Sequence, residues 1–167
     1  MNKRIRIGDI FSVKISENKK KFFQLIAYDL LQLNSDVIRA FKKEYPIDVI
    51  PEFSVLIIEE VEFYAHCIIK FGIKLNCWEK IGNILEVGKT ENIIFRATND
   101  YGHKQGEEPI RVSKSWYVWR INDNDFTEIG KLEGENRKAE IGIVFDTYSI
   151  VHRMKTGQYG GFYPDFE

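Results

Sequence analysis

The chain has 167 residues, a formal net charge of −1 and an aromatic content of 14%, with 12 Phe, 8 Tyr and 3 Trp. Its length suits one ordinary domain, and no shift in composition marks a boundary, so a single domain over residues 1–167 is predicted. A net charge near zero lacks the long-range positive field that nucleic-acid binding usually needs, which disfavours nucleic acid as a partner.

The N-terminus and the cysteines bear on the cellular compartment. Residues 1–11, MNKRIRIGDIF, lack the apolar core of a signal peptide. The aliphatic run at residues 55–58 is far shorter than the roughly 18 residues of a membrane span. Cys67 and Cys77 lie among apolar residues and are predicted to be free, buried thiols. Together these features predict a cytoplasmic protein without a membrane partner.

The N-terminal segment predicts a β-hairpin. Residues 5–15 place apolar side chains at alternate positions, interrupted at Gly8 and Asp9, which is typical of a half-buried strand entered through a turn or bulge. Residues 16–21 are polar and turn-forming. Residues 22–31, FFQLIAYDLL, are apolar on both alternate sets of positions, so they are predicted to form a central strand buried on both faces.

Two further segments permit both a helix and a strand. In residues 34–45, an early serine could cap a short helix. The alternation of Val37, Arg39 and Phe41, together with the neighbouring strands, favours a strand instead. Residues 53–60 leave a short helix and a strand equally open.

The middle of the chain predicts strands separated by tight turns. Residues 61–73 have apolar side chains on both alternate sets, which indicates another central strand. Residues 91–98 indicate a further strand, and residues 98–109 form the longest polar loop. Tight turns with positive φ angles are predicted at Gly72, Gly82 and Gly88.

The C-terminal third predicts a second hairpin and a last strand. Residues 113–121 and 126–132 are predicted strands joined by an INDND turn. In residues 141–154, β-branched and aromatic side chains favour a strand, with a short helix near its end left open. The predicted fold class is therefore mainly β, a β-rich α+β domain. Its antiparallel sheet would curl into a partial barrel or sandwich, with at most one or two short helices.

The sequence lacks the usual motifs for phosphate, cofactor and metal binding. Neither G-x-x-x-x-G-K-[ST] nor a strand-linked G-x-G-x-x-G occurs. No H-E-x-x-H or C-x-x-C spacing is present among the three histidines and two cysteines. No cofactor and no metal are therefore predicted.

The candidate catalytic groups favour structural roles. His66 lies in an apolar strand, where a hydrogen-bonded core histidine is the commoner role, and His152 lies near the end of the chain. The sequence contexts that mark a nucleophile beside a histidine are absent. The chain is therefore predicted not to be an enzyme. A hidden site that joins His66, His152 and nearby carboxylates is the third alternative.

A tryptophan-rich strand and acidic segments are the distinctive features of the sequence. In residues 116–119, alternate side chains point to opposite faces, so one tryptophan is predicted in the core while the other face is exposed. Exposed aromatic residues among acidic ones would anchor a basic partner, because tryptophan and tyrosine are enriched at interface hot spots. The candidate partner-binding residues are Tyr117, Trp119, Glu59, Glu60, Glu62, Glu107 and Glu108.

Several short motifs resemble one known family. They are GDIF at residues 8–11, an aromatic second strand, WEKIG at residues 78–82, a tryptophan-bearing strand and a KLEGE-type turn. In this order, over residues 8–157, they resemble the immunity protein 26 family of bacterial polymorphic toxin systems. The resemblance implies a mostly β fold with a characteristic tryptophan, Trp78 or Trp116. It also implies that the partner is a cognate toxin, neutralised by protein–protein contact, and it supplies no catalytic residue.

The main alternative is a small β-barrel that binds nucleic acid or peptides. In that case, exposed Tyr117, Trp119 and Phe162 would stack on bases, and the lysines at residues 19–21 would contact phosphates. The near-zero net charge argues against this alternative.

Overall fold

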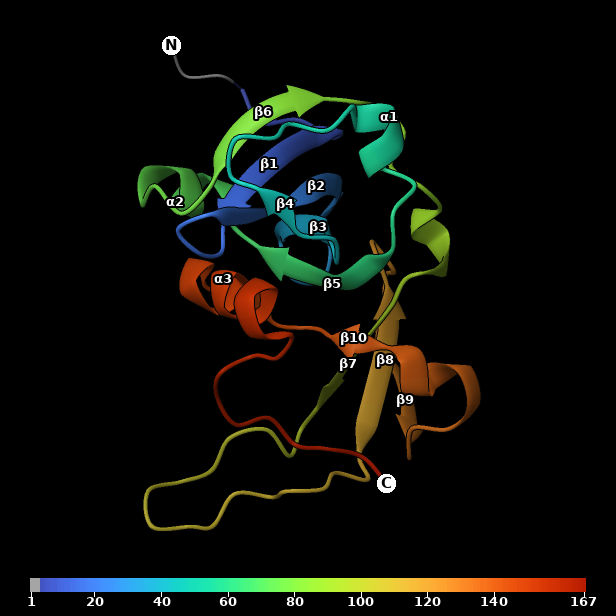
Figure 1. Ribbon diagram of the computed structural model, residues 1–167. Coiled ribbons are helices and arrows are strands. Elements are labelled where there is room, and N and C mark those ends of the chain that lie inside the picture. The colour runs from blue at the N-terminus through green and yellow to red at the C-terminus, as the bar shows by residue number, and fades with distance from the viewer. Residues whose placement is uncertain (1–3) are drawn as a thin grey trace.

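A computed structural model describes residues 4–167 and places the strands in two sheets (Figure 1). The strands of the larger sheet are β1 (Asp9–Lys14), β2 (Lys19–Asp29), β3 (Ser35–Phe41), β4 (Tyr45–Pro46), β5 (Val61–Cys67), β6 (Glu79–Asn83) and β11 (Val144–Phe145). This seven-stranded sheet has the order β11-β5-β3-β2-β1-β6, with β4 paired to β2. Its pairs are antiparallel except for β11, which runs parallel to β5.

The smaller sheet lies below the larger one in Figure 1. Its strands are β7 (Ile94–Thr98), β8 (Trp116–Arg120), β9 (Thr127–Gly130) and β10 (Glu140–Ile141). They follow the order β10-β7-β8-β9, and β10 runs parallel to β7. Two 3₁₀ helices, η1 (Thr90–Asn92) and η2 (Gly134–Lys138), precede β7 and β10.

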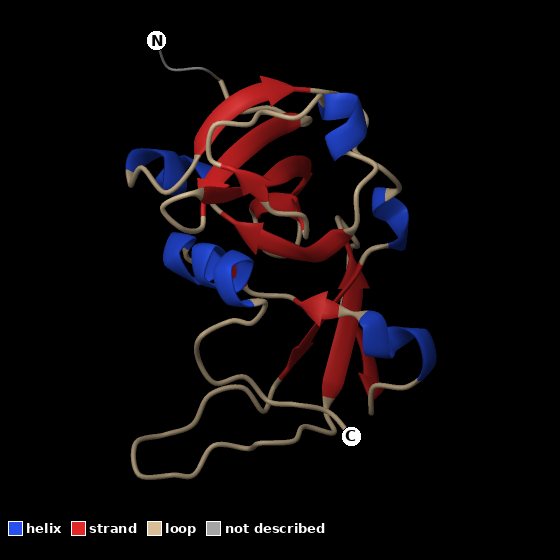
Figure 2. Ribbon diagram, in the orientation of Figure 1, coloured by secondary structure: helices blue, strands red, loops and turns tan. Residues whose placement is uncertain are grey.

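Three short α-helices accompany the sheets: α1 (Phe53–Leu56), α2 (Ile69–Lys74) and α3 (Thr147–Thr156). Figure 2 colours them blue together with η1 and η2. The predicted mainly β, β-rich α+β class is confirmed, although the chain has one helix more than the upper limit predicted. The sheets do not close into a barrel, because β11 and β6 remain at opposite ends of the larger sheet. Within residues 4–167, no helix has the length and apolar character that crossing a membrane would require.

The strands predicted in the N-terminal part are confirmed, although β1 is buried on both faces and not half-buried as predicted, because it lies between β2 and β6 within the sheet. β1 begins directly after Gly8, whose φ is +92°. β2 lies between β1 and β3, and most of its residues are buried, as its doubly apolar pattern predicted. Residues 34–45 form β3 and lead into β4, so the preferred strand reading of that segment is correct. Residues 53–60, left open by the sequence, contain α1.

Two segments predicted as strands are partly or largely helical. Residues 61–73 form β5 only as far as Cys67 and then continue as α2. Residues 141–154 contain the end of β10 (Glu140–Ile141) and all of β11 (Val144–Phe145), but most of the segment belongs to α3, so the helix left open near its end is the dominant element and the favoured strand is short. The Asp146 carboxylate accepts a hydrogen bond from the Ser149 backbone N–H at 3.0 Å, and this cap starts α3 in spite of its β-branched residues.

Gly72 and Gly82 are sites of close packing rather than the predicted turns. Gly72 lies within α2, where a Cβ would approach the Trp78 ring to 1.9 Å. Gly82 lies in β6, where a Cβ would approach the Phe53 ring to 2.2 Å. Only Gly88 has the predicted positive φ, at +75°.

The main core lies between the larger sheet, α2 and α3. Phe11 and Phe23 stack with ring centres 5.0 Å apart, and Trp78 meets Phe23 edge-on at 5.1 Å. Ile150 and Met154 of α3 pack into the same cluster. Full burial of such side chains contributes roughly 1.5–3 kcal/mol each, which fixes both helices against the sheet.

A second apolar cluster joins the two sheets. Ile26 and Val37 from the larger sheet pack with Phe95 and Trp119 from the smaller one. The sheets therefore share buried surface and are not connected by a linker alone.

Candidate functional site

An apolar hollow opens on the surface between α2, β11 and the first turn of α3. Its volume is about 480 Å³, within the roughly 300–1,000 Å³ that is typical of ligand sites. Figure 1 shows α2 and α3 as neighbours at one side of the larger sheet. We call this hollow the α2–α3 groove. Its apolar and aromatic lining residues are Ile68, Phe71, Leu75, Val144, Phe145 and Tyr148.

Large side chains at the rim of the α2–α3 groove are exposed to solvent. The exposed fractions are 57% for Phe71, 47% for Leu75 and 64% for Tyr148. Single exposed apolar residues are normal on any protein, but several around one hollow mark an interaction site. Aromatic side chains are also enriched at interface hot spots. These properties make the groove the best candidate for a functional site.

Buried contacts beneath α2 fix the first wall of the groove. The Asp36 carboxylate accepts a hydrogen bond from the Ile69 backbone N–H at 2.8 Å, and the Trp78 indole N–H donates to the Ile69 carbonyl at 2.9 Å. Burial raises the pKa of Asp36, while its bond to the Ile69 N–H lowers it. Because Gly72 has no side chain, the Trp78 ring lies directly under the helix, and Phe71 points outward.

The second wall of the groove is fixed at both ends of α3. Both oxygens of Asp146 are occupied, one by the Ser149 backbone N–H at 3.0 Å and the other by the Ser149 hydroxyl at 2.7 Å. These bonds lower the pKa of Asp146. At the other end, Gly157 adopts a φ of +82° and terminates the helix. Phe145 stacks on Tyr159 with ring centres 3.7 Å apart, which holds the strand that leads into α3.

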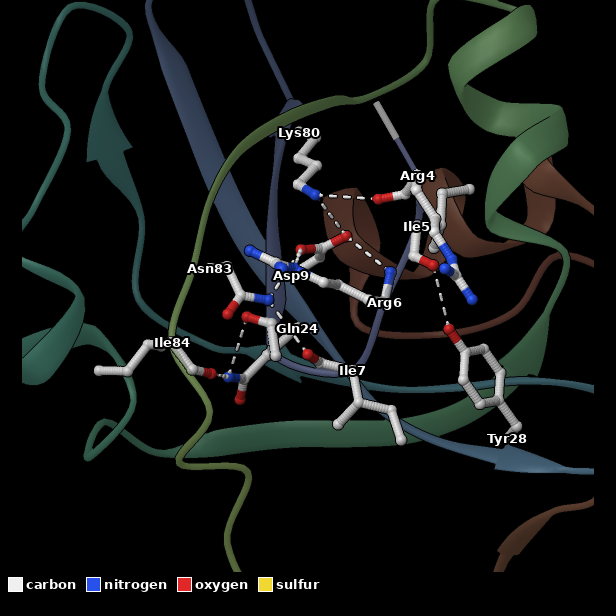
Figure 3. Close-up of polar contacts among 11 residues, drawn as sticks. Arg4, Ile5, Arg6, Ile7, Asp9, Gln24, Tyr28, Lys80, Asn83 and Ile84 are labelled. Atoms are coloured by element: carbon white, nitrogen blue, oxygen red, sulfur yellow. Dashed lines mark hydrogen bonds and ion pairs between the residues drawn. The ribbon is translucent and has the colours of Figure 1, made fainter. Parts of the chain in front are cut away.

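The two main motifs behind the family resemblance meet in a structural network (Figure 3). One oxygen of Asp9 accepts a hydrogen bond from the Asn83 side-chain amide at 2.8 Å. The other lies 2.8 Å from the Lys80 ammonium and 2.9 Å from the Arg6 backbone N–H. Both oxygens of Asp9 are therefore satisfied, and the network ties residues 4–9 to β6. This arrangement is typical of a structural carboxylate rather than a reactive one.

A buried histidine–aspartate pair lies between the two sheets. His66 Nε2 is 2.8 Å from Asp29 Oδ2, and both side chains are fully buried. Burial lowers the pKa of His66, and this effect exceeds the opposing one of Asp29. The Phe95 ring centre lies 4.2 Å from the imidazole centre. His66 is thus a hydrogen-bonded core histidine, as the sequence predicted, and its lowered pKa favours the neutral imidazole.

The groups considered for a hidden catalytic site do not meet in one pocket. His152 is exposed on α3, whereas His66 is enclosed between the sheets. Both cysteines are free as predicted, but only Cys67 is buried, and Cys77 is half-buried. Burial raises the pKa of the Cys67 thiol, which disfavours the reactive thiolate. Within residues 4–167, no group of three or more His, Cys, Asp and Glu side chains is placed to hold a metal ion.

Three of the predicted acidic anchors are neutralised by lysines of neighbouring segments. The pairs are Glu59–Lys43 at 3.0 Å, Glu60–Lys42 at 3.1 Å and Glu62–Lys21 at 3.0 Å. Glu59 also accepts a hydrogen bond from the Tyr45 hydroxyl. Each carboxylate at the start of β5 thus has a cation of its own, so these residues do not form a free acidic patch.

The remaining predicted anchors lie in two other places. Glu107 and Glu108 are exposed in the long loop between β7 and β8, which extends away from both sheets in Figure 1. No ion pair engages either of them within the part of the chain that the structure describes. Trp119 is only 2% exposed, and Tyr117 is half-buried beside it. The prediction that Trp119 is an exposed anchor is wrong because its face of β8 packs against the larger sheet.

The lysines predicted to contact phosphates in the nucleic-acid alternative have other contacts. Lys19 pairs with Glu44 at 2.7 Å, and Lys21 pairs with Glu62 at 3.0 Å. Lys20 is buried, with its ammonium 5.5 Å from the Phe22 ring centre. These side chains therefore do not form the free cationic stripe that a phosphate backbone needs.

The α2–α3 groove was missed from the sequence because its walls come from segments far apart in the chain. The available signal was the spacing of Phe71 and Leu75, which places both on one side of a helix, but their segment continued a strand pattern.

Comparison with family models, curated proteins and solved structures found no match for this chain.

Proposed function

We propose that this protein binds another protein through the α2–α3 groove and that the partner is a bacterial toxin, which it neutralises in the cytoplasm. The observation that carries the proposal is the exposed apolar rim, where Phe71 and Tyr148 are both more than half exposed. Apolar surface that a partner removes from water contributes roughly 25 cal/mol per Å² to the free energy of binding. These two large side chains therefore suit an interface hot spot.

The choice of a toxin as the partner is supported by the resemblance to the immunity protein 26 family. The motif residues Gly8, Asp9 and Lys80 hold β1 against β6, so they would specify the fold of such a protein and not its contacts. A surface that recognises one particular toxin would then lie outside these motifs. Phe71 and Tyr148 both do.

The rigidity of the groove walls also supports a binding role. α2 and α3 are held by buried Trp78, Ile150 and Met154, so the rim side chains stand on a preformed base. A preformed interface loses little conformational entropy on association, and this favours the tight binding that neutralisation requires.

Co-expression tests the proposal. The chain is expressed together with the protein encoded immediately upstream of its gene, with an empty vector as the control. We expect the neighbouring product alone to arrest growth, and we expect the chain to restore growth and to co-purify with that product. A neighbouring product without toxicity, or a growth arrest that the chain does not relieve, would remove the toxin as the partner.

A further inference from the structure

Three lysines without ion-pair partners among the described residues lie on the two helices that form the α2–α3 groove. Lys70 and Lys74 on α2 are exposed, and Lys74 lines the hollow. Lys155 lies two helical turns after Tyr148 on the same side of α3 and is also exposed. Within residues 4–167, none of these three ammonium groups has a carboxylate within ion-pair distance.

The lining of the groove holds one carboxylate, Asp146, whose oxygens accept hydrogen bonds from Ser149. In the described part of the chain it forms no ion pair with any of the three lysines, so positive charge is in excess on the two helices. Lys70 and Lys74 are also four residues apart on a six-residue helix, a spacing at which like charges repel. By contrast, the lysines beside β5 all have carboxylate partners. Carboxylates on a bound molecule would supply the missing counter-charge.

We propose that the α2–α3 groove recognises an acidic amphipathic segment of its protein partner, an inference that rests on the function proposed above. Large apolar side chains of that segment enter the hollow between Phe71 and Tyr148. Its flanking Asp and Glu side chains meet Lys70, Lys74 and Lys155. This is the helix-in-groove mode of peptide recognition with a charged border. The expected partner surface is therefore acidic, opposite in sign to the basic surface that the sequence had suggested.

A protein segment fits this site better than an anionic membrane does. A membrane surface is flat and would touch only the protruding rim, so the hollow of about 480 Å³ between α2, β11 and α3 would stay empty. A segment with large apolar side chains fills the hollow and covers the rim in a single contact.

Two synthetic amphipathic peptides of equal length and identical apolar residues test the inference, one with Glu and the other with Lys at the flanking positions. Fluorescence anisotropy measures their affinity for the full chain. We expect the Glu peptide to bind at least about fivefold more tightly, since three exposed ion pairs of ordinary strength supply that preference. The preference should fall as salt rises from about 0.05 to about 0.5 M.

Matched double variants locate the preference. In K70E/K74E the preference for the Glu peptide should vanish or reverse. In K89E/K104E, which changes the same charge at exposed lysines outside the groove, it should persist. Circular dichroism verifies that both variants remain folded. Equal or tighter binding of the Lys peptide, absence of binding by both peptides, or an unchanged preference in K70E/K74E would overturn the inference.

Other occupants of the groove give distinct results. A second copy of the chain would appear as a dimer by analytical ultracentrifugation, and a membrane would appear as binding to phosphatidylglycerol vesicles that exceeds binding to the Glu peptide. Either result overturns the inference. Growth rescue that K70E/K74E retains in full would refute the acidic segment while the proposed function stands. A Glu-peptide preference without growth rescue would refute the proposed function alone.

Discussion

At the scale of single residues, the contact between Gly72 and Trp78 fixes α2 over the core. A Cβ at position 72 would lie 1.9 Å from the Trp78 ring, which is buried and packs edge-on against Phe23. We expect Gly72→Ala to lower the free energy of unfolding by roughly 1–3 kcal/mol, the usual cost of overpacking. In a Trp78→Leu background the same substitution should cost clearly less, and urea denaturation of all four proteins measures this. An equal loss in both backgrounds would contradict the packing role.

His66 gives a second prediction at this scale. Above about pH 6.5, the ordinary pKa of histidine, the imidazole is neutral in both the folded and the unfolded chain. In this range, protonation of His66 does not reduce the free energy of unfolding. As the pH falls below this value, the unfolded chain binds a proton that the buried imidazole does not, because burial lowers the pKa of His66. The free energy of unfolding should therefore decrease from about pH 7 towards about pH 5.

The matched variant for this prediction is His66→Gln, whose amide can still donate to Asp29 but does not titrate. Half-buried Asp36 and Glu140 also titrate with raised pKa values, so the informative quantity is the difference between wild type and variant at each pH. As the pH falls, the free energy of unfolding should decrease more for the wild type than for His66→Gln. A constant difference would show that His66 does not control the acid response.

At the scale of elements, the ion pairs between β5 and its neighbours differ in burial. The Lys21 and Glu62 side chains are 7% and 19% exposed, whereas those of Lys42 and Glu60 are 59% and 70% exposed. Lys21→Met leaves a poorly solvated carboxylate without its cation, so we expect a loss of roughly 2–4 kcal/mol. Lys42→Met should cost less than about 1 kcal/mol. Equal losses in chemical denaturation would contradict this distinction.

Some of the strands and helices could be predicted from the sequence and others could not. β1, β2 and β3 were predictable because each shows a local sequence pattern. Apolar residues either alternate along the strand or occupy both of its faces. The extent of α3 was underestimated, and a strand was favoured, because β-branched residues outweighed a short capping signal, Asp146 followed by Ser149, and a terminal glycine at position 157. Other features depend on which segments become neighbours in the fold, which the sequence alone does not specify. They are the pairing of Glu59 and Glu62 with lysines and the burial of Trp119.

At the scale of the whole molecule, the motifs that resemble an immunity family and the candidate binding site are in different places. Gly8, Asp9 and Lys80 join the N-terminal segment to β6, whereas the α2–α3 groove lies beside β11. The core cluster around Trp78 connects both regions, because α2 and α3 rest on it. The fold thus provides a rigid base on which groove residues can vary without disturbing the motifs.

The most direct test of the account is growth rescue by groove variants. Cells that express the upstream product, the proposed toxin, receive the wild type, Phe71→Ala/Tyr148→Ala or a control variant. The control is Leu30→Ala/Leu85→Ala, whose leucines are 64% and 76% exposed outside the groove. We predict that the groove variant fails to rescue growth, because each lost hot-spot side chain costs about 2 kcal/mol of binding. The control should rescue like the wild type, with all three chains equally stable. Full rescue by the groove variant would contradict the account.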